Sequence, residues 1–119
     1  MRASRRAPSR ITSVLARWEA SAGLFRKRKQ SMSEAKAIVQ AFIEVAGIDV
    51  LPLDARDEAL ALDIFETHGR HAVPESKRNR ALNMADCFHY AVAKRRGVPI
   101  LTKDEGFAFT DLETIGAPA

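Results

Sequence analysis

The sequence has few residues of the kinds that cross-link small proteins through disulfides or anchor proteins at membranes. Among its 119 residues it has one cysteine (Cys87), one tryptophan and one tyrosine. A single cysteine excludes an internal disulfide and any cysteine-based zinc cluster. No apolar run approaches the roughly 20 residues that a membrane span needs. We therefore expect no membrane association, and the cytoplasm is the default compartment.

Acidic residues are also scarce near the N-terminus. Residues 1–30 carry nine Lys or Arg and only Glu19 as an acid, a local charge of +8, while the other 89 residues have a charge of −4. Residues 1–10 show no apolar period, so we expect a disordered basic arm ahead of one domain over residues 11–119. Such an arm attracts polyanions, although a solvated tail is the simpler interpretation.

Helices alternate with short apolar strands along the rest of the chain. We expect helices capped by Thr12 or Ser13, by Ser31 or Ser33, by Asp54 and by Asn83. The expected ends are near residue 28, at Gly47, at Gly69 and at residue 96 before Gly97. Strands are expected in "RITS", "IDVLPL" and "VPILT", with a polar loop at "RHAVPESKRNRA" and one further edge strand after residue 102. This order predicts an α/β fold with a parallel sheet.

Three acids fall at points that such a fold brings to one edge. Asp86 lies in the first turn of a helix, Asp104 follows a strand, and Glu19 lies one to two turns into the helix after "RITS". Ligands bind at this edge of α/β sheets. Three converging carboxylates repel one another unless a hard cation such as Mg²⁺ or Mn²⁺ joins them. Each acid also has a plain interpretation, as a helix cap, a turn residue or an ion-pair partner.

Other candidates are weaker. Cys87 has no activating neighbour and is expected in the core. The three histidines have no zinc-ligand spacing. The cations at positions 94 to 96 suit the C-terminal end of a helix. Lys103 and the basic arm are candidate phosphate contacts.

The segment "LNMADCFHYAVAKRRGVPILTKDEGFAFTDL" resembles the PIN-domain toxins of bacterial type II toxin–antitoxin systems, the VapC family. The matching positions are Leu82, Asn83, Asp86, Cys87, Phe88, Tyr90, Ala91, Ala93, Phe107, Thr110 and Asp111. The stretch "ITSVLARWEASAGLFRKR" also looks like the family's helix that bears its second acid, here Glu19. The resemblance covers about residues 10 to 115.

This resemblance implies a three-layer α/β/α sandwich and a metal-dependent endoribonuclease. Its cofactor would be Mg²⁺ or Mn²⁺, its substrate RNA, and its partners a VapB-type antitoxin and a second copy of the chain. Carried over by position, Glu19, Asp86 and Asp104 are catalytic metal ligands. Glu105 is the alternative to Asp104, and Asp111 is a further candidate acid near the site.

One departure from the family shapes a second hypothesis. The family opens with a strand of the form "hhhDTSAhh" that carries its first acid, whereas this chain opens with "MRASRRAPSR". We therefore expect an N-terminally truncated PIN-like domain, with the start codon misassigned or the gene shortened, and a metal site one ligand short. The alternative function is a degenerate domain that binds antitoxin or RNA without catalysis. A plain helical domain with acids at its caps is the third hypothesis.

Overall fold

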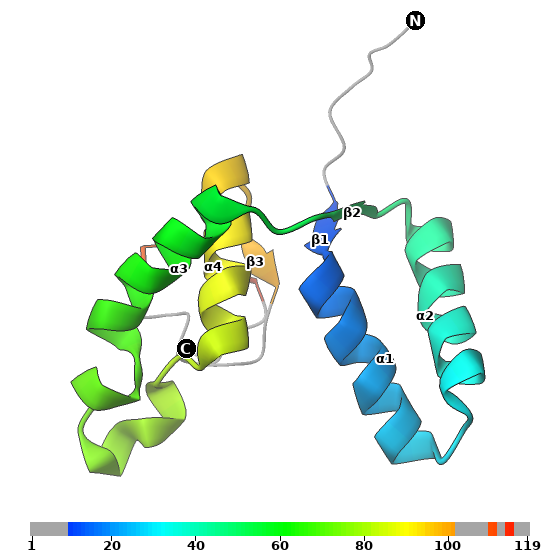
Figure 1. The fold of residues 1–119 in the computed structure, drawn as a ribbon, viewed down its shortest axis with the longest axis horizontal. Helices are drawn as coiled ribbons and strands as arrows, with labels where there is room; N and C mark the ends of the chain where they lie inside the picture. Colours follow the sequence, from blue (N-terminus) through cyan, green and yellow to red (C-terminus); the bar gives the residue numbers. More distant parts are fainter. Residues whose placement is uncertain (1–9, 102–109, 112–113, 116–119) are drawn as a thin grey trace, which may run out of the picture. The chain divides into compact units, whose positions relative to one another are not determined.

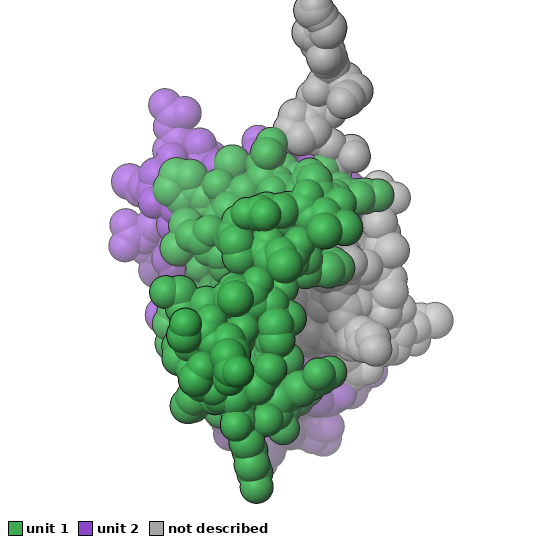
Figure 2. Space-filling view, turned by 90° about the vertical axis from the view of Figure 1, so that its right-hand side faces the viewer, with its two compact units in different colours: residues 1–52 green, residues 53–119 purple. Residues whose placement is uncertain are grey.

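The computed structural model describes residues 10–101, 110–111 and 114–115 (Figure 1). The chain divides into two compact units, residues 1–52 and 53–119, which Figure 2 colours separately. Each unit is built from helices and one pair of parallel strands. No helix in the described ranges is long and apolar enough to cross a membrane.

The first unit is a helical hairpin joined to a strand pair. Its elements are β1 (Ile11–Ser13), α1 (Val14–Arg28), α2 (Met32–Ala46) and β2 (Asp49–Leu51). β1 and β2 run parallel, with Ile11 opposite Asp49 and Ser13 opposite Leu51. The two strands meet because α1 and α2 return the chain beside its start, as Figure 1 shows.

Local hydrogen bonds explain where the helices of the first unit begin and end. The Ser13 hydroxyl accepts from the backbone N–H of Ala16 at 3.0 Å, which caps α1. Ser31 and Glu34 form a reciprocal capping box at the start of α2. Gly47 ends α2 at φ 66°, a left-handed conformation that suits glycine. All three positions follow the sequence prediction.

The second unit packs two long helices side by side. It contains α3 (Ala55–His68), the short 3-10 helices η2 (Arg70–Ala72) and η3 (Glu75–Arg80), α4 (Met84–Arg96), β3 (Ile100–Leu101) and β4 (Thr114–Ile115). β3 and β4 are parallel. The stretch expected to be a loop between α3 and α4 thus contains two 3-10 turns. Among the described residues of this unit, seven form a buried core cluster: Ala61, Ile64, Leu82, Cys87, Tyr90, Ala91 and Ala93.

Hydrogen bonds at both ends hold α3 and α4 antiparallel. At one end, Arg95 from the last turn of α4 donates to Asp57 in the first turn of α3, with 2.8 Å between Nη1 and Oδ1. At the other end, the N–H of Leu82 donates to the carbonyl of His68 at 2.8 Å. The end of α3 therefore lies beside the start of α4 (Figure 1).

The predicted α/β fold class is confirmed, since both described strand pairs are parallel and flanked by helices. The two pairs belong to different units, so the expectation of one shared sheet edge for the acids stays a prediction. The expected basic arm lies almost wholly outside the described residues, and the domain boundaries stay a prediction.

Candidate functional site

Asp86 lies in the first turn of α4, as the sequence predicts. Its Oδ2 accepts from the backbone N–H of Asn83 at 3.0 Å, and Asn83 Oδ1 accepts from the N–H of Asp86 at 2.8 Å. This reciprocal pair is a complete capping box, so the capping interpretation of Asp86 is confirmed. Because a carboxylate offers about four lone-pair positions, the cap leaves room for further ligation.

Cys87 follows Asp86 and turns into the core, where its side chain is 2% exposed. Burial raises the pKa of the Cys87 thiol to about 11, and the negative charge of Asp86 adds to the rise. A thiol that is buried in the core and protonated at neutral pH is a poor nucleophile. The prediction that Cys87 is a core residue is confirmed.

Asp111 is held by two side chains of α4. Its Oδ1 accepts from the Tyr90 hydroxyl at 2.6 Å, and its Oδ2 pairs with the Lys94 ammonium. The hydrogen bond from Lys94, then that from Tyr90, lowers the pKa of Asp111. Asp86, Tyr90 and Lys94 are spaced four residues apart, so they form one stripe along α4. Asp111 therefore contacts the helix face that begins at Asp86.

Glu19 lies in α1 of the first unit and is exposed. Asp86 belongs to the second unit, so the two acids reside in separate parts of the chain. Asp104, its alternative Glu105 and the candidate phosphate contact Lys103 lie outside the described residues. Over the described ranges no cluster of three or more His, Cys, Asp or Glu is suited to a metal ion. The proposed ligand set therefore stays a prediction.

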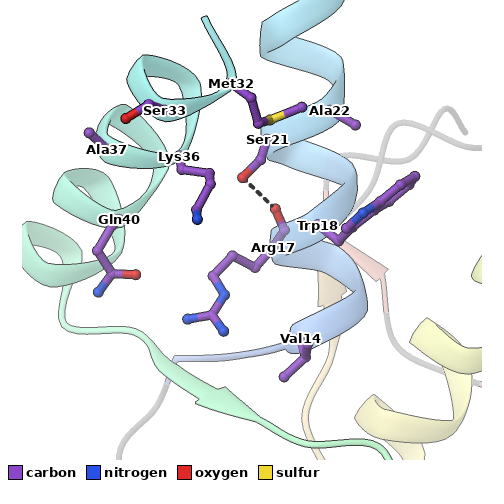
Figure 3. Close-up of a pocket in the computed structure, with 10 residues that line it drawn as sticks. All are labelled: Val14, Arg17, Trp18, Ser21, Ala22, Met32, Ser33, Lys36, Ala37 and Gln40. Atoms are coloured by element: carbon purple, nitrogen blue, oxygen red, sulfur yellow. Dashed lines mark hydrogen bonds between the residues drawn. The ribbon is translucent and has the colours of Figure 1, made fainter.

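A groove of about 750 Å³ runs between α1 and α2 within the first unit. Figure 3 shows Arg17, Lys36 and Gln40 reaching into the space between the two helices. Helical spacing turns Glu19 about 200° away from Arg17, onto the opposite side of α1. The groove is therefore separate from the face of α1 that carries the candidate acid.

The contacts of two buried side chains were not predicted from the sequence. Asp57 is fully buried and accepts from both Arg95 and Arg96. Tyr90 is 7% exposed and meets Asp111 across 21 positions of sequence. The sequence offered one signal for this contact: Tyr90 and Lys94 lie one helical turn apart, so their side chains can reach the same partner.

Comparison with known proteins settles the family. The family model described as "PIN domain" matches residues 2–112. The chain belongs to the PIN-domain family. The match covers both units, so the helices that carry Glu19 and Asp86 are parts of one PIN-type sequence.

Curated relatives place the chain in the VapC group of PIN domains. A VapC ribonuclease of Rhizobium meliloti is 33% identical over 84% of this chain and 75% of its own length. Ribonuclease VapC30 of Mycobacterium tuberculosis is 33% identical over 61% of this chain and 52% of its own length. Ribonuclease VapC42 of the same species is 26% identical over 71% of this chain and 62% of its own length. The chain thus spans about half to three quarters of these relatives.

Proposed function

We propose that this protein is a metal-dependent endoribonuclease and the toxin of a type II toxin–antitoxin pair, acting in the cytoplasm. The observation that carries this proposal is the 33% identity to a VapC ribonuclease across 84% of the chain. Asp86 in the first turn of α4 adds a carboxylate at a helix terminus, fixed by its capping box. The substrate in this proposal is RNA.

Glu19, Asp86 and Asp104 are the proposed metal ligands, with Glu105 as the alternative to Asp104. The donor chemistry fits Mg²⁺ or Mn²⁺, because these hard cations prefer carboxylate oxygens and retain water. Cys87 is consistent with this choice, since its side chain is only 2% exposed and lies in the core, away from solvent. When bound, such an ion supplies an activated water and offsets negative charge on the cleaved phosphate.

The residues around Asp86 have a positioning part in the proposal. The Asn83 N–H holds Oδ2 of Asp86 and so orients its carboxylate at the start of α4. Asp111 stays a candidate further acid near the site, and its two oxygens are engaged by Tyr90 and Lys94 of α4.

The test is cleavage of single-stranded RNA by the purified chain. We expect Mg²⁺- or Mn²⁺-dependent cleavage that EDTA stops and that Asp86→Asn or Glu19→Gln lowers at least 100-fold. Glu58→Gln is the matched control, because Glu58 is an exposed acid in the first turn of α3 and should leave the rate unchanged. The proposed mechanism would be wrong if the Asp86→Asn variant and the parent chain cleaved RNA at equal rates.

The toxin role and the partners need a test in cells. We expect expression of the chain to arrest growth, Asp86→Asn to abolish the arrest, and co-expression of the cognate VapB-type antitoxin to relieve it. A homodimer should be seen by light scattering. Binding of antitoxin or RNA without any cleavage would instead favour the degenerate-domain alternative, which the ribonuclease names of the relatives do not favour.

A further inference from the structure

The connection between α3 and α4, residues 69–81, is strongly basic; we name it the basic loop. It contains Arg70, Lys77, Arg78 and Arg80 against the single acid Glu75. Arg70, Lys77 and Arg78 make no ion pair with any residue in the described ranges. Within the described part of the chain, these three cations therefore present positive charge that no carboxylate pairs with.

Cations at the opposite end of the α3–α4 pair behave differently. Lys94 pairs with Asp111, Arg95 with Asp54 and Asp57, and Arg96 with Asp57. Those three cations hold the fold together and are neutralised by carboxylates. The contrast distinguishes these structural cations from Arg70, Lys77 and Arg78, which form no ion pair with a described residue.

The basic loop is held in shape by its own contacts. The Leu82 N–H donates to the carbonyl of His68 at 2.8 Å and closes the base of the loop, where Leu82 is 1% exposed. Arg78 Nε donates to the carbonyl of Val73 at 3.1 Å and links the two halves. His71 donates from Nε2 to the carbonyl of Glu66, 2.9 Å away, and its ring lies against Phe65. A preorganised loop loses little entropy when it binds a partner.

The position of the loop relates it to Asp86. The loop runs directly into the first turn of α4, and Asp86 follows Arg80 by six residues. In Figure 1 the loop, in yellow-green, lies at the same end of the helix pair as the start of α4. Arg56, in the first turn of α3, lies at the opposite end, because the helices are antiparallel.

We propose that the basic loop binds the sugar–phosphate backbone of the RNA next to the phosphate that is cleaved. Arg70 and Lys77 are exposed and contact phosphates directly, while Arg78 adds its Nη nitrogens and keeps the loop closed. This inference rests on the proposed ribonuclease function, which supplies the RNA and places the reaction at Asp86. Phosphate contacts of this kind bind without reading sequence.

The experiment measures binding of a fluorescent single-stranded RNA by anisotropy, in the Asp86→Asn background to prevent cleavage. Arg70→Gln and Lys77→Gln should each weaken binding about three- to tenfold at low salt. Each should also reduce the slope of log affinity against log salt by about 0.7, the value for one phosphate contact on a single strand. Arg56→Gln removes the same charge at the other end and is expected to change neither quantity.

Equal losses in all three variants would show that only net charge matters and would overturn the proposal. Unchanged salt slopes for Arg70→Gln and Lys77→Gln would overturn it as well. Thermal unfolding checks that the variants fold, since substitutions of exposed side chains usually change stability little. Cleavage by the parent chain is measured separately. RNA binding that depends on the loop, without cleavage, would reject the nuclease function and retain the loop as an RNA-binding site. Cleavage with unchanged salt slopes would retain the nuclease function and reject the loop as an RNA-binding site.

Discussion

Tyr90 donates its hydroxyl hydrogen to Oδ1 of Asp111, with 2.6 Å between the two oxygens. Burial and this hydrogen bond raise the pKa of Tyr90 to about 12, so the phenol stays a donor throughout the physiological range. Lys94, one turn further along α4, pairs with the second oxygen of Asp111. The two contacts tie Asp111 to the helix that carries Asp86.

Replacing Tyr90 by Phe removes this hydrogen bond and little else. We expect the free energy of unfolding to fall by about 1 kcal/mol, the usual net value of one hydrogen bond. Urea denaturation measures the change. In the Asp111→Ala background the same substitution should cost much less, because its acceptor is already gone. Fully additive losses in this double-mutant cycle would refute the contact.

The lowered pKa of Asp111 predicts a pH dependence of stability. A carboxyl whose pKa is lower in the folded state stabilises the fold above its unfolded pKa of about 3.9, and this stability is lost as pH falls through the folded value. The stability difference between the parent and Asp111→Asn should thus be constant from pH 7 to 5 and shrink below pH 4. The Asp111 side chain is 53% exposed, so solvent screening keeps the effect small. A difference that grows towards low pH would contradict this assignment.

Asp57 should be the most sensitive acid for folding of the second unit. It is fully buried and accepts from Arg95 Nη1 at 2.8 Å, Arg96 Nη1 at 3.2 Å and the N–H of Asp54 at 3.0 Å. Asp57→Ala leaves both guanidinium groups without this partner. We expect a loss of about 3 kcal/mol, the low end for a broken buried ion pair, because the arginines are partly exposed. The adjacent Glu58→Gln should cost under about 0.5 kcal/mol in the same denaturation assay.

Asn83 and Asp86 allow capping to be separated from metal binding. Asn83→Ala removes the cap and should cost about 1 kcal/mol of stability, yet retain any rise in melting temperature upon adding Mg²⁺. Asp86→Asn keeps an oxygen that can accept from the Asn83 N–H, so it should keep most of the stability but lose the Mg²⁺-induced rise. Differential scanning fluorimetry with and without Mg²⁺ measures both. The metal role of Asp86 is rejected if the two variants respond to Mg²⁺ alike.

Element boundaries were predictable because they depend on neighbours in sequence. Ser13, Ser31, Asp54 and Asn83 each accept backbone N–H groups within three residues, so a cap can be identified without knowing the fold. The ends at Gly47 and Gly97 follow from the left-handed conformation that glycine adopts readily. The family resemblance, carried by the segment around Asp86, was equally local and is confirmed.

The partners of the charged side chains were not predictable in this way. The sequence indicated that Lys94, Arg95 and Arg96 favour a helix C-terminus, but not that each has a carboxylate partner. Arg95 and Asp57 are 38 positions apart, and they meet because α3 and α4 pack antiparallel. The basic loop lies at the opposite end of this helix pair, next to the first turn of α4 that contains Asp86. The sequence alone thus determined the helices, their caps and the family. The tertiary structure decided which charges are neutralised, because ion pairs between residues so far apart in sequence depend on how the helices pack.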